Sequence, residues 1–202
     1  MIWPTTSVEA SAVALPRSCS WASDFVLATL FAALMALGAQ IAIPLPYTPV
    51  PITLQVLFVL LAGGLLGARA GTVSQLEYLL MGTFGLRVFA GGTGAQIWLG
   101  ARGGYLIGFV AAAYVIGRIL EATRWQTRWI PIALGGGIIT IYLFGAAWLA
   151  GWYALARHVS FADALTRAVA AGVVPFIAVD LVKLLVAVPA VSAAAFWSRK
   201  ER

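Results

Sequence analysis

Two charged residues, Asp180 and Lys183, lie three positions apart in an otherwise apolar stretch of the sequence. Residues at this spacing share one face of a helix. A charge in the middle of a bilayer costs roughly 2.5 to 3.5 kcal/mol, so the pair is expected to face protein or a water-filled cavity. The two groups would suit a ligand that offers N–H donors to the carboxylate and an anion to the ammonium. A mutually neutralised structural pair is the alternative.

Two loops add candidate residues. The segment from Ile43 to Gln55 contains four prolines, and because proline fixes φ this connector is stiff. It is either a rigid turn or a preorganised wall of a binding site.

The segment from Val88 to Tyr105 is rich in glycine, so it is either a flexible turn or a place where backbone approaches a ligand closely. It is no phosphate loop, because the chain has no G-x-x-x-x-G-K-[ST] sequence.

The elements that carry these residues must lie in a membrane. The 202 residues are 62% hydrophobic and only 10% charged, which excludes a soluble globular domain and a disordered chain. At roughly 20 residues a span, the length allows about six crossings. The net charge of +6 comes from basic residues scattered singly between apolar stretches, so no nucleic-acid partner is expected.

The apolar runs predict an all-α protein with one six-helix membrane domain over residues 25–197, between an N-terminal segment, 1–24, and a basic tail, 198–202. Asp24 is expected to cap the first helix, and Pro44 and Pro46 to end it. Ser160 followed by Asp163 predicts a short surface helix over 161–171. The six spans are expected at 25–43, 52–68, 71–88, 104–120, 129–153 and 173–196.

The distribution of basic residues orients the bundle. With six crossings, one side holds eight lysines and arginines and the other holds four, namely Arg87, Arg102, Arg157 and Arg167. If the second and third segments form a re-entrant hairpin, the balance becomes seven to five. In both cases the positive-inside rule predicts cytoplasmic termini and a multi-pass protein of a bacterial-type cell membrane. The proline-rich loop, the glycine-rich loop and the outer end of the last helix then share the outer side.

Two features of the spans stay open at this point. Glu77 is a further charge at membrane depth, and no partner is evident for it in the sequence. Ala28, Ala32 and Ala36 recur every four residues on the first span, and such a stripe of small residues permits close approach of another helix. Spacing alone favours packing within the chain over docking of a partner protein.

Longer stretches make the chain resemble a known family. The stretch from Ala33 to Gln40, the loop Ile-Pro-Leu-Pro-Tyr-Thr-Pro-Val-Pro-Ile-Thr-Leu-Gln and the stretch from Leu61 to Gly67 are similar to the BioY family. Further matches are Gly85-Leu86, Val-Phe-Ala-Gly-Gly at 88–92, Gly-Gly-Tyr-Leu-Ile-Gly-Phe at 103–109, Pro175-Phe176 and Asp-Leu-Val-Lys at 180–183. These proteins are the biotin-specific substrate-binding (S) components of energy-coupling-factor (ECF) transporters.

The resemblance implies a six-helix bundle that captures biotin from the outside. It implies a membrane coupling (T) subunit and a pair of ATPases as partners; the ATPases consume ATP, so this chain is no enzyme and needs no cofactor. The alanine stripe would dock the coupling subunit. Asp180 would accept from the ureido N–H groups and Lys183 would meet the valerate carboxylate, with Tyr105, Gln55 and the Gly91 region completing the cavity.

Three other functions are compatible with parts of the sequence. The chain could be an S component for another vitamin. It could be a self-sufficient, proton-coupled carrier of a small molecule, with Glu77 or Asp180 as the proton relay. An intramembrane enzyme is disfavoured, because His158 is the sole histidine and has no nucleophile or metal-ligand cluster near it in the sequence.

Overall fold

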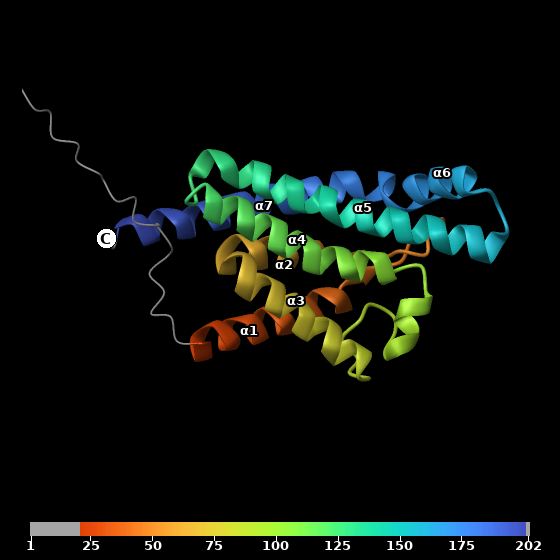
Figure 1. Ribbon diagram of the computed structural model, residues 1–202, viewed down its shortest axis with the longest axis horizontal. Coiled ribbons are helices and arrows are strands. Elements are labelled where there is room, and N and C mark those ends of the chain that lie inside the picture. The colour runs from red at the N-terminus through yellow and green to blue at the C-terminus, as the bar shows by residue number, and fades with distance from the viewer. Residues whose placement is uncertain (1–20, 201–202) are drawn as a thin grey trace, which may run out of the picture.

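A computed structural model of the chain describes residues 21–200, which are mostly helical (Figure 1). A short antiparallel hairpin of β1 (Ala42–Ile43) and β2 (Ile52–Thr53) closes the proline-rich loop. Two 3-10 helices, η2 (Ala95–Leu99) and η3 (Thr127–Trp129), precede α4 and α5. The bundle consists of α1 (Trp21–Gln40), α2 (Gln55–Leu61) with the π-helical turn η1 (Ala62–Leu66), α3 (Gly67–Thr83), α4 (Gly103–Ala122), α5 (Ile130–Arg157), α6 (Phe161–Gly172) and α7 (Val174–Lys200).

Five helical stretches of the described chain are long and apolar enough to cross a membrane. One of them, residues 55–83, folds back on itself at Gly67, whose φ of +78° ends the preceding helix. A Cβ on Gly71 would lie only 2.9 Å from the carbonyl oxygen of Ala62, so the start of α3 packs against η1. The second and third predicted spans are therefore two legs of a tight helical hairpin.

The first helix differs from its prediction at both ends. It already includes Trp21 and it ends at Gln40, so Asp24 lies in its first turn and does not cap it. The prediction that the span continues to Ile43 is wrong, because Ala42 and Ile43 pair with Thr53 and Ile52 across the hairpin. Most of the predicted N-terminal segment, residues 1–20, and the last two residues of the basic tail lie outside the described residues.

The surface helix is confirmed. The Ser160 side chain accepts from the backbone N–H of Asp163 and caps α6 at the predicted position. The helix runs one residue beyond its predicted end, to Gly172. Of its residues, Ala164 and Ala168 are fully buried, which fits a helix that lies on the bundle with one small-residue face.

Figure 1 shows that the start of α1 and the end of α7 lie at the same end of the bundle. The opposite end, here named the loop end, carries residues 41–53, 84–102 and the α5–α6 connection at 158–160. The segments that the sequence predicts on one side of the membrane thus gather at one end of the fold.

At the other end of the bundle, close contacts hold the turn of the α2–α3 hairpin against α4. A Cβ on Gly117 of α4 would lie 2.0 Å from the backbone nitrogen of Ala68, so the two helices touch through their backbones. Glu121 also accepts from the Ala68 N–H at 2.7 Å, and the Trp125 indole donates to the Gly64 carbonyl at 3.0 Å. These contacts fix the turn from which α3 rises towards the loop end.

We expect Gly117→Ala to destabilise the protein, because a methyl group there meets backbone that cannot move aside; overpacking of this kind costs about 1–3 kcal/mol. Thermal unfolding in detergent measures the effect. Gly135→Ala in α5 is the matched control, since no atom lies within 4 Å of a Cβ at that position and alanine is the better helix former. Equal melting temperatures for the two variants would contradict the close contact.

Candidate functional site

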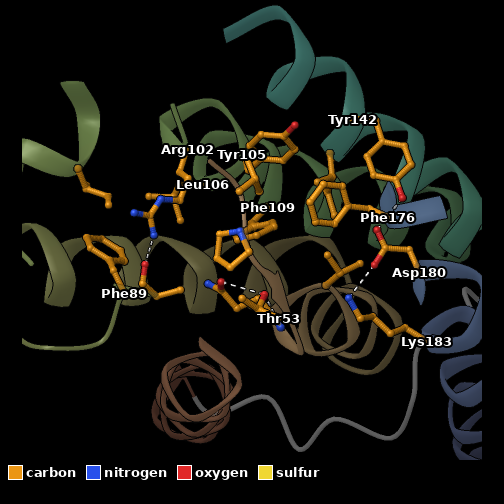
Figure 2. A pocket seen from close by; sticks show the side chains of 17 residues that line it. Thr53, Phe89, Arg102, Tyr105, Leu106, Phe109, Tyr142, Phe176, Asp180 and Lys183 are labelled. Atoms are coloured by element: carbon orange, nitrogen blue, oxygen red, sulfur yellow. Dashed lines mark hydrogen bonds and ion pairs between the residues drawn. The ribbon is translucent and has the colours of Figure 1, made fainter. Parts of the chain in front are cut away.

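A cavity at the loop end brings together most of the binding residues that the sequence predicts. Gln55, Tyr105, Asp180 and Lys183 all line it (Figure 2). They come from three helices, α2, α4 and α7, which the bundle places around one space. Gly91 does not line this cavity, although its neighbour Ala90 does. Further lining residues are Val50, Pro51, Thr53, Val56, Phe89, Ile97, Arg102, Leu106, Phe109, Ile141, Tyr142 and Phe176.

Asp180 and Lys183 form an ion pair in the wall of the cavity. The ammonium donates to one Asp180 oxygen at 2.7 Å, and the Tyr142 hydroxyl of α5 donates to the other at 2.6 Å. Asp180 and Lys183 are only 2% and 5% exposed, so each charge depends on its partner. The cluster is formally neutral, yet Lys183 keeps N–H donors and Asp180 keeps lone pairs for a ligand.

A chain of hydrogen bonds fixes Gln55. The Thr53 hydroxyl donates to its amide oxygen at 3.1 Å, and its amide nitrogen donates to the Tyr78 hydroxyl at 2.7 Å. Tyr78, fully buried on α3, donates in turn to the Val88 carbonyl at 3.2 Å. The chain joins the proline-rich loop, the α2–α3 hairpin and the glycine-rich loop, so Gln55 is a rigid part of the cavity wall.

Tyr105 contributes its ring to the cavity but not its hydroxyl. Figure 2 shows the hydroxyl directed away from the space, and it donates to the Gly172 carbonyl at 2.8 Å. A Cβ on Gly145 or on Gly172 would overlap the tyrosine, so both glycines make room for it. The residue therefore ties α4 to the end of α6 while its ring forms an apolar wall.

Arg102 places a second cation on the cavity. Its guanidinium donates to the Ala90 carbonyl, and a Cβ on Gly91 would lie 3.3 Å from the same group. Gly91 has a φ of +72°, so this glycine shapes the turn that meets the arginine. Burial lowers the pKa of Arg102 from its ordinary value, but an arginine stays protonated at neutral pH.

The rest of the cavity wall is apolar. Phe109 and Phe176 stand between Arg102 and Asp180 in Figure 2, and Phe89 and Ile141 line the same cavity. Such a cavity suits a ligand with an apolar body and polar groups at its ends.

Some predicted features lie elsewhere. Ala28 and Ala32 are fully buried and Ala36 is partly buried, so in this structure the alanine stripe is packed within the chain. Glu77 does not line the cavity; both of its carboxylate oxygens are buried without a hydrogen-bond partner among residues 21–200. His158 is exposed in the α5–α6 connection.

Sequence reasoning missed two residues of the cavity. Tyr142 lies 38 positions from Asp180 in an apolar span, where nothing marks one tyrosine as the partner of a carboxylate. Arg102 lies within the predicted glycine-rich segment, directly before Gly-Gly-Tyr at 103–105, but its charge was interpreted only as an indicator of orientation and not as a binding group. A cation next to a predicted binding loop on the outer side was the signal that could have identified it.

Comparison with known proteins agrees with the sequence motifs. The model of the BioY family matches residues 8–200. The biotin transporter BioY of Thermotoga maritima is 39% identical over 165 residues, which is 81% of this chain and 90% of that protein. The probable biotin transporter BioY of Pyrococcus horikoshii is 41% identical over 83% of this chain and 93% of its own length.

A solved structure has the same fold. The crystal structure of the S-component for biotin from an ECF-type ABC transporter aligns with a TM-score of 0.72 at 27% identity, over 85% of this chain and 90% of that one. Because the family model covers all of the described residues, this chain belongs to the BioY family, a family of membrane transport proteins and not of enzymes.

Proposed function

We propose that this chain captures biotin in the loop-end cavity and acts as the S component of an ATP-driven ECF transporter. The names of its relatives and of the solved structure support this function. The observation that carries it within this chain is the cavity itself, in which an apolar middle separates the neutral Asp180–Lys183 cluster from Arg102, a cation with no acidic partner among the described residues.

The Asp180 cluster is suited to the ureido ring of biotin. That ring is uncharged and bears N–H donors beside a carbonyl acceptor. Asp180 has acceptor capacity for the N–H groups, and Lys183 or Tyr142 can donate to the carbonyl. A neutral ring against a neutral ion pair leaves no unbalanced charge in the buried wall.

Arg102 is suited to the valerate carboxylate. Lys183 is already neutralised by Asp180 at 2.7 Å, whereas the guanidinium of Arg102 has only a backbone carbonyl as its partner in the described chain. A guanidinium can bind a carboxylate through two parallel hydrogen bonds. The sequence motifs had suggested Lys183 as the partner of the valerate carboxylate. We assign this carboxylate to Arg102 instead.

The proposal also includes how the bundle lies in the membrane. The six helical legs α1, α2–η1, α3, α4, α5 and α7 form the membrane bundle, with the loop end outside and the ends of α1 and α7 towards the cytoplasm, as the basic residues indicate. The sequence contains no nucleotide-binding lysine loop, so energy must come from ATPases joined through a coupling subunit. Docking through the alanine stripe would require α1 to move away from the helices that bury it.

Arg102→Gln should weaken biotin binding by about tenfold or more, since hydrogen bonds to charged groups contribute about 1.5–3 kcal/mol. Biotin methyl ester, which has no carboxylate, should lose much less. Titration calorimetry on the detergent-solubilised protein measures both. Arg87→Gln is the control, because it makes the same charge change on an exposed residue outside the cavity. If Lys183→Ala, and not Arg102→Gln, distinguishes acid from ester, the carboxylate lies at Lys183.

Tyr142→Phe should weaken biotin and its methyl ester by the same factor, several-fold, because it removes a hydrogen bond from the cluster that meets the ring. Asp180→Asn should weaken both far more and lower the melting temperature, since it leaves the Lys183 ammonium buried without its carboxylate. The same titrations together with thermal unfolding test this. Unchanged binding of both ligands in both variants would exclude the cluster as the ring site.

Cells that contain this chain without any coupling ATPase should bind labelled biotin but not accumulate it. Restoring the coupling subunit and ATPases should restore uptake. Accumulation that continues without an ATPase and stops when a protonophore is added would instead identify a proton-coupled carrier. Competition of labelled biotin with other unlabelled vitamins tests whether the cavity serves a different vitamin.

A further inference from the structure

A second hollow at the loop end lies outside the cavity described above. It is lined by two arginines, Arg157 of α5 and Arg167 of α6, and by Tyr47 of the proline-rich loop and Tyr153 of α5, with Ala170 and Ala171 at its side. Four side chains that can donate hydrogen bonds to an oxyanion therefore border one surface depression.

The positive charge of this hollow is not compensated. Neither Arg157 nor Arg167 has a hydrogen-bond or ion-pair partner among residues 21–200. The nearest acid in the sequence, Asp163, lies one turn before Arg167, but it is engaged at the cap of α6, where Ser160 donates to its carboxylate at 2.7 Å. Two arginines without acids attract an anion from solution.

The direction of α6 places the hollow on the aqueous side. Phe161, Leu165 and Val169 are exposed at successive helical turns, and this apolar stripe suits contact with lipid. At about 100° per residue, Arg167 points roughly opposite to Leu165 around the helix. The arginine flank of α6 therefore faces away from the stripe and towards the proline-rich loop, where a dissolved anion has access.

The hollow also adjoins the cavity through shared structural elements. Gly172, the residue after Ala171, accepts the hydrogen bond of the cavity residue Tyr105. Tyr47 belongs to the same loop as Val50 and Pro51, which line the cavity. The proline-rich loop therefore borders both the hollow and the cavity, and the end of α6 that borders the hollow also holds the cavity residue Tyr105.

We propose that Arg157 and Arg167 form an outer encounter site for carboxylate anions, where biotin is held by its carboxylate before it enters the cavity. This inference rests on the proposed function. The site makes no contact with bound biotin, whose carboxylate lies on Arg102, but its long-range field raises the association rate and, with dissociation unchanged, the affinity by the same factor. Long-range attraction of this kind increases association rates tenfold or more and weakens with salt.

Stopped-flow binding of biotin to the detergent-solubilised protein tests the proposal. The double variant Arg157→Gln/Arg167→Gln should lower the association rate constant about tenfold at low salt, leave the dissociation rate constant unchanged and approach the wild-type rate at high salt. Biotin methyl ester should associate equally fast with both proteins. Arg87→Gln, with one exposed arginine removed outside the hollow, should change the rate less than twofold, and an unchanged melting temperature should show that the double variant folds.

The outcomes separate the inference from the proposed function. A wild-type protein that does not bind biotin contradicts the proposed function. A wild-type protein that binds biotin, with the same association rate in the double variant, overturns the encounter site alone. An effect of the double variant on dissociation, or an equal effect on the uncharged ester, also overturns it. Slower association of the wild type in nanodiscs with anionic lipid than with uncharged lipid, absent in the variant, would show that a lipid phosphate occupies the arginines instead.

Discussion

A carboxylate and an ammonium can share the apolar interior of this bundle only because each neutralises the other and Tyr142 satisfies the second carboxylate oxygen. Removing one member would leave an uncompensated charge where water is scarce. The need to keep these three groups in contact also positions the helices. It holds α7 against α5 in one register and turns the polar face of α7 inward. The remaining walls of the cavity are arranged around this cluster.

Glycines allow the helices to come close enough for that arrangement. Gly104 has Trp148 of α5 where a Cβ would stand, and Gly145 has the ring of Tyr105. Because α4 and α5 touch at these points, the tyrosine can pass over α5 and reach the carbonyl at the end of α6. The same contacts leave its ring at the wall of the cavity. Side-chain volume is thus concentrated in a few aromatic residues, and small residues supply the space for them.

The sequence predicts features that depend on local periodicity and composition. The apolar runs located the helices to within a few residues, and the i, i+3 spacing placed Asp180 and Lys183 on one face. The cap at Ser160 was also predictable, because it depends on residues three positions apart. The end of α1 was not, since it is set by pairing of Ala42 and Ile43 with a strand ten residues away.

Features that depend on contacts between residues far apart in the sequence could not be predicted. Which tyrosine reaches Asp180, and that the Tyr105 hydroxyl leaves the cavity, depend on the distance between helices that are far apart in sequence. The sequence shows the charge of Arg102 but not its place in the cavity wall, because only the fold brings the turn at Gly91 against its guanidinium. The inward direction of Ala28 and Ala32 likewise depends on how α1 packs, which spacing alone cannot determine.

The fold-back at Gly67 has a geometric consequence for the depth of the cavity. The helical leg formed by α2 and η1 begins at Gln55 and ends at Leu66, so at about 1.5 Å per residue it is roughly 18 Å long. The hydrocarbon core of a bilayer is about 30 Å thick. This leg is therefore about 12 Å shorter than the hydrocarbon core is thick, and the β hairpin and the proline-rich loop precede it at the loop end. Gln55, the first residue of this leg, and Val50, Pro51 and Thr53 of the preceding loop all line the cavity, so the cavity lies where the short leg gives way to the loop.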